Sequence, residues 1–190
     1  MAEFAALALK WNPAINLIAK STVADIHNRH IADSAQLYDL ADDFTHWVDL
    51  GSGGGFPGIV IATIAREKNP SAKITMVESD QRKCEFLRHA SRTLGLDTQV
   101  LNARIEAAEP LDGDVVSARA LTALDQLCVF FQRHKTKDGV GLFPKGVSAA
   151  QELAAALETW NMDYRSHQSI TDPSAVILEV RDLSRVRPAS

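Results

Sequence analysis

The sequence contains little cysteine and no long apolar run. Its 190 residues include only two cysteines, Cys84 and Cys128, which argues against a disulfide scaffold or a cysteine-based zinc site and favours a reducing compartment. No apolar run approaches the ~20 residues that a membrane-spanning helix needs. The N-terminus carries the acid Glu3 early and lacks a basic region, so it is a poor signal peptide. We therefore expect a cytoplasmic protein with no membrane partner and no metal.

An excess of positive charge is also missing. The 24 acidic residues outnumber the 20 basic ones and give a net charge of −4. This excludes a globally basic nucleic-acid binder but leaves room for local basic patches, of which residues 81–92 and 133–145 are candidates. The composition, with 46% hydrophobic and 23% charged residues, matches an ordinary globular domain. At ~150 residues per domain, the length predicts a single domain over residues 1–190.

The hydrophobic periodicity predicts an α/β fold. Residues 2–11 and about 22–41 are predicted to be helical, with Thr22 as the N-cap of the second helix. The predicted strands are 45–50, 73–78, 98–102, 114–118, 139–143, 164–170 and 175–180. The predicted helices between them are 57–68, 80–94, 122–133 and 146–160. This alternation predicts a mostly parallel, seven-stranded sheet with helices on both faces, an antiparallel final pair of strands and a ligand site at the carboxyl ends of the strands. The helical cap is expected over 1–43 and the core over 44–190.

A glycine cluster follows the first predicted strand. Five of the ten glycines lie between positions 51 and 58, whereas a plain turn needs only one or two. The run 53–58 satisfies G-x-G-x-x-G, the dinucleotide pattern, while 51–55 satisfies G-x-G-x-G, the pattern of S-adenosylmethionine enzymes. The strand is predicted to end at Leu50 and Asp49 precedes the turn, which favours the second pattern. The loop's candidate ligand contacts are Gly51, Ser52, Gly53 and Gly55.

Glu78 ends the second predicted strand. An acid at that position can accept hydrogen bonds from both ribose hydroxyls of an adenosine group. Because NAD and S-adenosylmethionine both contain adenosine, Glu78 supports an adenosine ligand without choosing between the two. The alternative is a solvated strand end.

Further segments extend the pattern beyond the loop. On spacing alone, Arg29, His30 and Asp33 describe a surface helix with an Arg29–Asp33 pair one turn apart. In chain order, however, this segment joins a longer series. The series comprises Trp11-Asn12, Asn16-Leu17, Arg29-His30 with Asp33-Ser34, Asp49 to Ile59, Arg82-Lys83 with Phe86-Leu87, Arg104 to Glu106, Ser117 to Ala120, and Lys145-Gly146. Over about residues 10 to 147, the chain closely resembles the ribosomal RNA small-subunit methyltransferase G family, also called glucose-inhibited division protein B.

The resemblance implies a fold, a reaction and a set of site residues. It implies a Rossmann-like class I S-adenosylmethionine-dependent methyltransferase that methylates N7 of one guanine in 16S rRNA. Because N7 of neutral guanine has a free lone pair, no general base is expected, and Arg119 and His30 are expected to position the reactants. The other implied roles are cofactor contacts for Gly51, Phe56, Ile105, Glu106 and Arg119, and an RNA-facing position for Arg29, His30 and Lys145.

Several alternatives remain open at this point. A methyltransferase of the same fold could act on a small molecule or a protein, and a non-catalytic RNA-binding module could keep the fold. A nicotinamide-dependent oxidoreductase would use the G-x-G-x-x-G pattern, but 190 residues leave little room for its substrate domain. The expected partner is 16S rRNA within the 30S subunit or an assembly intermediate, and the protein is expected to be a monomer.

Overall fold

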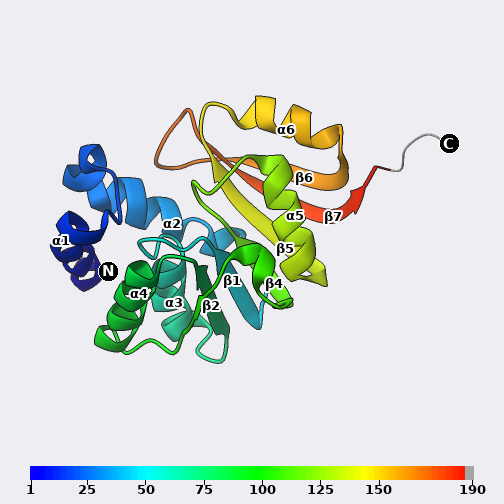
Figure 1. The fold of residues 1–190 in the computed structure, drawn as a ribbon. Coiled ribbons are helices and arrows are strands. Elements are labelled where there is room, and N and C mark those ends of the chain that lie inside the picture. The colour runs from blue at the N-terminus through cyan, green and yellow to red at the C-terminus, as the bar shows by residue number, and fades with distance from the viewer. Residues whose placement is uncertain (187–190) are drawn as a thin grey trace.

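A seven-stranded sheet forms the centre of the molecule in the computed structural model, which describes residues 1–186 (Figure 1). The strands are β1 (His46–Leu50), β2 (Lys73–Glu78), β3 (Gln99–Asn102), β4 (Gly113–Ser117), β5 (Lys135–Lys145), β6 (Trp160–Gln168) and β7 (Val176–Arg185). Their order across the sheet is β3-β2-β1-β4-β5-β7-β6, and within the described residues β7 alone runs in the direction opposite to the other strands. The predicted fold class is therefore confirmed.

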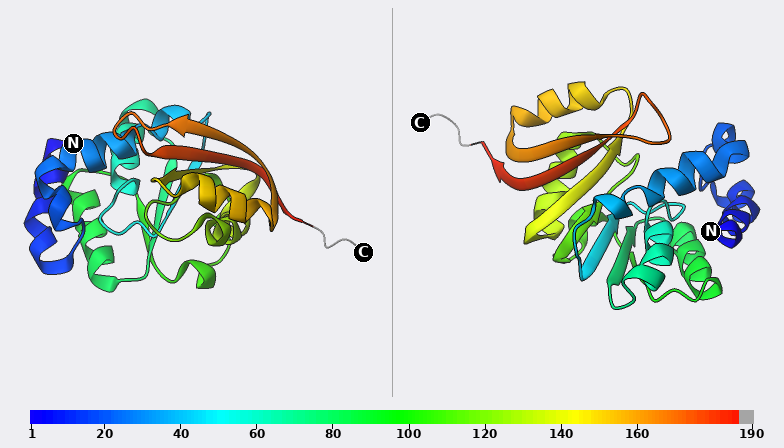
Figure 2. Two further views of the ribbon diagram at one scale, coloured as in Figure 1. Left: turned by 90° about the horizontal axis from the view of Figure 1, so that it is seen from above. Right: turned by 180° about the vertical axis from the view of Figure 1, so that it is seen from behind.

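Helices cover both faces of the sheet (Figure 2). They are α1 (Ala2–Ile15), α2 (Asp33–Ala35), α3 (Gly58–Lys68), α4 (Gln81–Thr93), α5 (Leu124–His134) and α6 (Ala149–Leu157). Successive strand residues point to opposite faces, so Trp47 joins a cluster with α1, α3 and α4 while Val48 joins one with α5 and α6. No helix within residues 1–186 is long and apolar enough to span a bilayer.

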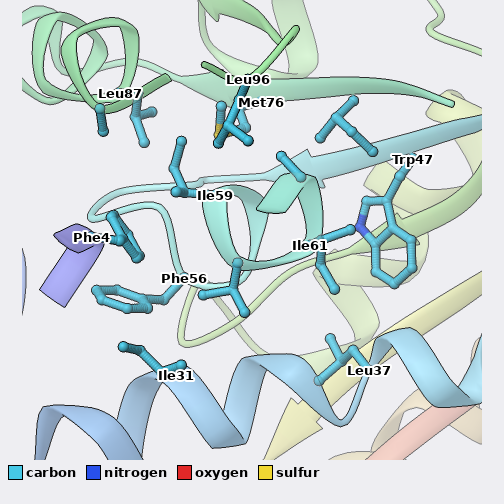
Figure 3. Packing of buried hydrophobic residues seen from close by; sticks show 14 of the residues in the cluster. Phe4, Ile31, Leu37, Trp47, Phe56, Ile59, Ile61, Met76, Leu87 and Leu96 are labelled. Carbon is cyan, nitrogen blue, oxygen red and sulfur yellow. The ribbon is translucent and has the colours of Figure 1, made fainter. Parts of the chain in front are cut away.

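The segment before β1 packs against the glycine-rich loop. Phe56 of that loop is 5% exposed, and its ring centroid lies 4.9 Å from that of Phe4 on α1. Ile31 belongs to the same buried cluster and lies nearby on the following helical segment (Figure 3). The N-terminal segment is thus anchored to the loop that ends β1.

The predicted continuous helix over residues 22–41 is wrong. The segment consists of a 3-10 helix (Lys20–Asp25), a π-helix (His27–Ala32), the short α2 and a second 3-10 helix (Tyr38–Leu40). Thr22 lies inside the first of these instead of capping a helix, and its hydroxyl contacts His30. The Arg29 carbonyl within the π-helix accepts a hydrogen bond from Arg119. Tertiary contacts of this kind override a regular helical period, and π-turns are frequent at functional sites.

The last two strands are antiparallel, as predicted, but their bounds differ. The helix predicted to reach residue 160 ends at Leu157, and β6 begins at Trp160. Trp160 is 2% exposed because its ring packs in the cluster beneath α5, where its Nε1 donates a hydrogen bond to Asp125 (2.9 Å). The turn between the strands, residues 169–175, contacts the helical segment near Asp33 and Gln36.

Candidate functional site

A cleft of about 680 Å³ opens at the carboxyl ends of β1, β2 and β4, within the range typical of small-molecule sites. This is the position at which open parallel sheets bind ligands. The predicted cofactor residues that line it are Gly51, Ser52, Gly53, Phe56, Glu78, Ile105, Glu106 and Arg119. Gly55 is the one predicted cofactor residue that does not line it. We call this cavity the cofactor cleft.

Gly51 and Gly55, both with positive φ, set the shape of the glycine-rich loop that follows β1. Gly51 has φ +67°, a conformation that favours glycine, and its N–H donates to the Val77 carbonyl at 2.9 Å. Gly55 has φ +82°, and a Cβ there would lie 2.6 Å from Cγ1 of Ile59 and 3.1 Å from the Phe4 ring. Gly55 therefore permits the close packing of the loop on α1 and α3 rather than direct contact with a ligand.

Glu78 holds the rim of the loop from the neighbouring strand. One carboxylate oxygen accepts from the Gly53 N–H at 2.9 Å and the other from the Asp80 N–H at 2.8 Å. The residue is 8% exposed and lines the cleft. A carboxylate offers about four lone-pair sites, so two further hydrogen bonds remain available. These free acceptor positions fit the ribose hydroxyls of S-adenosylmethionine, and Gly51 and Gly53 on the loop leave room for close approach.

Asp49, at the end of β1, holds the glycine-rich loop in place through hydrogen bonds. Its carboxylate is buried and accepts hydrogen bonds from the Gly58 N–H at 3.1 Å and the Ser117 hydroxyl at 2.8 Å. Burial raises the pKa of Asp49 to about 6, against the opposing effect of these hydrogen bonds. Asp49 thus ties β1, β4 and the start of α3 together beneath the cleft.

The rest of the cleft lining includes both predicted and unpredicted residues. Ile105 is 7% exposed, whereas Glu106 beside it is exposed. Leu17, Ile18 and Ala19 also line the cleft, and the sequence analysis did not predict them as site residues. The signal that could have found them is Asn12, whose side-chain oxygen accepts from the N–H groups of Leu17 and Ile18 at 2.7 and 2.9 Å.

Arg119 lies at the end of the cleft, where it binds four groups. It donates to the carbonyls of Phe56 (3.3 Å) and Arg29 (3.2 Å), to the Asp33 carboxylate (3.3 Å) and to His30 Nδ1 (2.8 Å). Its guanidinium also lies 5.5 Å from the centroid of the Phe56 ring. With 17% of the side chain exposed, Arg119 is held in one orientation while still facing the cleft.

The tautomer of His30 follows from its two partners. Arg119 can only donate, so Nδ1 accepts and the ring proton lies on Nε2, which donates to the Thr22 hydroxyl at 2.8 Å. Burial and the neighbouring Arg119 lower the pKa of His30 from 6.5 to about 4, although Asp33 opposes them. His30 is therefore neutral at neutral pH and acts as a hydrogen-bond acceptor for Arg119.

The cations expected to face RNA are paired with carboxylates. Arg29, half-exposed, binds Asp172 at 2.7 Å instead of the Asp33 partner that helical spacing suggested. The Lys145 side chain is only 8% exposed, and its Nζ donates to Glu152 (2.7 Å) and to the Thr122 carbonyl (2.8 Å). The structure thus brings both residues to the Arg119 side of the molecule, but with their charges neutralised.

The chain is similar to one family along nearly its whole length. The family model for rRNA small subunit methyltransferase G matches residues 1–180. A ribosomal RNA small subunit methyltransferase G of Cereibacter sphaeroides is 54% identical over 185 residues, covering 97% of this chain and 89% of the relative. A protein of the same name from Ruegeria pomeroyi is 48% identical over 183 residues, covering 96% and 90%.

Several solved structures with the same fold are methyltransferases, and each has low sequence identity to this chain. One from Geobacter sulfurreducens superimposes with a TM-score of 0.63 at 15% identity, covering 94% of this chain and 88% of that one. A SAM-dependent methyltransferase from Aquifex aeolicus gives 0.63 at 11%, covering 87% and 98%. TYW2 of M. jannaschii, in complex with AdoMet, gives 0.60 at 12%, covering 92% and 80%. At these identities the likeness concerns the fold.

Proposed function

The chain belongs to the rRNA small subunit methyltransferase G family, and from this membership we propose its reaction: S-adenosylmethionine-dependent methylation of N7 of one guanine in 16S rRNA. The observation that carries the proposal is the cofactor cleft. It joins the glycine loop, the adenosine-type acid Glu78 and Arg119 at the carboxyl edge of the sheet. Gly51 directly follows β1, which supports the G-x-G-x-G pattern over the dinucleotide alternative.

The residues of the cleft divide the binding task. Glu78 would accept hydrogen bonds from the ribose hydroxyls, and Ile105 and Glu106 would hold the adenine. The loop residues Gly51, Ser52, Gly53 and Phe56, which line the same cleft, would hold the rest of the cofactor. Gly55 supports this wall by its packing. When bound, S-adenosylmethionine supplies an electrophilic methyl group on its sulfonium sulfur.

The protein's contribution to the reaction is positioning. Guanine N7 attacks through its own lone pair, so no side chain has to remove a proton first. Arg119 orients the acceptor or the cofactor carboxylate through its planar fork of N–H groups. Neutral His30 keeps that fork in place through its Nδ1. Correct alignment of two reactants can supply ~7–11 kcal/mol of a barrier, so no further chemical group is required.

The acceptor is 16S rRNA within a folded ribonucleoprotein, either the 30S subunit or an assembly intermediate. The net charge of −4 and the paired cations Arg29, Arg119 and Lys145 support this proposal, because they provide little attraction for bare RNA. The protein acts in the cytoplasm, where its substrate is made, and as a monomer.

A transfer assay tests the reaction. Labelled S-adenosylmethionine is incubated with unmethylated 30S subunits and, in parallel, with naked 16S rRNA, and the modified base is identified by mass spectrometry. We expect 7-methylguanosine at one site and faster transfer to the subunits. Label in no RNA despite cofactor binding would leave a methyltransferase of another acceptor, or a non-catalytic module, as the better description.

A further inference from the structure

A second cleft, of about 490 Å³, adjoins the cofactor cleft. Five residues line both cavities: His30, Arg119, Ala120, Leu121 and Thr122. The two cavities therefore meet at the loop after β4 and at the His30 ring. A group-transfer enzyme needs its donor and acceptor sites to share a boundary, and this loop is such a boundary.

The walls of the second cleft come from distant parts of the chain. Its lining comes from the helical segment near His30, from the turn between β6 and β7, and from the end of β5 with Gly146. The turn is fixed to the helical segment by hydrogen bonds from Thr171 to Asp33 (2.8 Å) and from Gln36 to Ser169 (3.2 Å). The cavity is consequently part of the folded structure and not a gap between loose loops.

The charges around this cleft balance. Its three cations, Arg29, Arg119 and Lys145, are paired with Asp172, Asp33 and Glu152, at 2.7, 3.3 and 2.7 Å. His30, the remaining titratable side chain in the lining, is neutral at neutral pH. A phosphate placed here would meet three carboxylates together with the cations, whereas an uncharged polar ring would meet no net charge.

Arg119 retains one donor at the boundary. Its four hydrogen bonds occupy four of the five N–H groups of a guanidinium. The fifth, on Nη2, has no partner among residues 1–186. A single donor at this point suits a carbonyl oxygen such as O6 of guanine, whose neighbouring N7 must face the cofactor cleft if the methyl group is to be transferred to it.

We propose that the second cleft receives the acceptor base as an uncharged purine, with Arg119 donating to its O6, and that the RNA phosphates bind outside it. This inference rests on the proposed reaction and names the site of its acceptor. A loop nucleotide must leave its stack to enter such a cavity, as in other enzymes that modify nucleic-acid bases.

The β5–α6 loop offers a matched pair of variants. Gly146 lines the second cleft, and a Cβ added to it meets no atom within 4 Å. Val147, the next residue, is 86% exposed and lines neither cleft. The variant Gly146→Trp adds bulk at the mouth of the second cleft, and Val147→Trp adds the same bulk beside it. Ala175→Phe adds bulk at a second lining position, at the end of the β6–β7 turn.

Transfer to 30S subunits and affinity for S-adenosylmethionine are measured for all three. We expect Gly146→Trp and Ala175→Phe to lower kcat/KM for RNA at least about tenfold by steric exclusion. Cofactor affinity, which also reports a correct fold, and the activity of Val147→Trp stay within about twofold of wild type. Wild-type activity in both cleft variants, or an equal loss in Val147→Trp, would overturn the proposal.

A binding measurement separates this inference from the proposed reaction. Guanosine and inorganic phosphate are each titrated into the complex with S-adenosylhomocysteine, and amide shifts are followed by NMR. We expect guanosine to shift the amides of Ala120, Thr122 and Gly146, and phosphate to leave them unchanged. The reverse pattern would make the cleft a phosphate site and overturn the inference, whatever the wild-type transfer assay shows. A wild type that binds guanosine here but methylates no RNA would instead count against the proposed reaction.

Discussion

The two clefts share a boundary but are built in opposite ways. The loop of the cofactor cleft is formed by backbone groups of residues 51–56 and by Glu78, all close to the ends of two adjacent strands. The second cleft is closed by side-chain ion pairs between distant segments, including Arg29 and Asp172, which are 143 positions apart. Cofactor binding is therefore encoded in a local motif, and acceptor binding in the tertiary fold.

The largest expected effect comes from the residue that belongs to both clefts. Arg119→Lys keeps the charge but loses the planar fork that holds His30, Asp33 and the backbone in place. We expect kcat/KM for RNA to fall about a hundredfold, because small misplacements are costly in aligned reactions. Single-turnover methylation measures this.

Arg133→Lys is its matched control. Arg133 donates twice to the Ala108 carbonyl, and it lines neither cleft. This variant should keep wild-type activity. If Arg119→Lys behaved in the same way, Arg119 would be a structural residue and the boundary between the clefts would have no role in transfer.

A second variant tests whether the cofactor cleft can be weakened without affecting the second cleft. In Glu78→Gln an amide NH₂ replaces one of the carboxylate oxygens that accept from Gly53 and Asp80. Hydrogen bonds to charged groups contribute ~1.5–3 kcal/mol, so we expect affinity for S-adenosylmethionine to fall at least about tenfold. KM for RNA should not change. Calorimetric titration measures the affinity, and Glu85→Gln on the exposed side of α4 is the control.

The difference between the clefts also explains what the sequence could predict. The strand–loop–helix order and the position of Glu78 are local patterns, so the sheet and eight of the cofactor-cleft residues followed from them and from the family resemblance. The breaks in the helix over 22–41 did not, because they lie where the segment meets distant residues, such as Arg119, which donates to the Arg29 carbonyl from 90 positions away. The sequence also did not predict the ion pair between Lys145 and Glu152. In its own helical pattern Glu152 is an ordinary surface position, and nothing in the sequence marks it as a partner of Lys145.

A third variant tests the contribution of the β6–β7 turn to the second cleft. Thr171→Val removes the hydrogen bond to Asp33, which in turn orients Arg119. Such a bond contributes about 0.5–1.5 kcal/mol, and we expect kcat to fall about fivefold while cofactor affinity is unchanged. Thr171→Ser restores the hydroxyl and should restore kcat. An equal loss in both variants, or a matching loss of cofactor affinity, would assign the turn a general structural role.

The last prediction concerns the pH dependence of stability. Burial and Arg119 lower the pKa of His30 to about 4, with Arg29 acting in the same direction and Asp33 and Asp25 opposing them. Between pH 4 and 6.5 the imidazole is therefore protonated in the unfolded chain and neutral in the folded protein. His30 therefore makes the free energy of unfolding increase with pH across that window. NMR should show the imidazole titrating near pH 4. Denaturation of His30→Gln should show a weaker pH dependence there, and titration near 6.5 would contradict the described network.

The position of β7 has a consequence for the newly made polypeptide. Among the strands of residues 1–186 it is the last in chain order, yet it lies between β5 and β6 and not at an edge of the sheet. Since a chain is made from its N-terminus, the glycine loop, Glu78 and Arg119 leave the ribosome while the turn at 169–175 and β7 are still unmade. A nascent chain of that length has the parts of its cofactor cleft but no wall for its acceptor. Competence to modify RNA, unlike the capture of the methyl donor, therefore arises only when synthesis has passed β7 and this strand has inserted into the sheet.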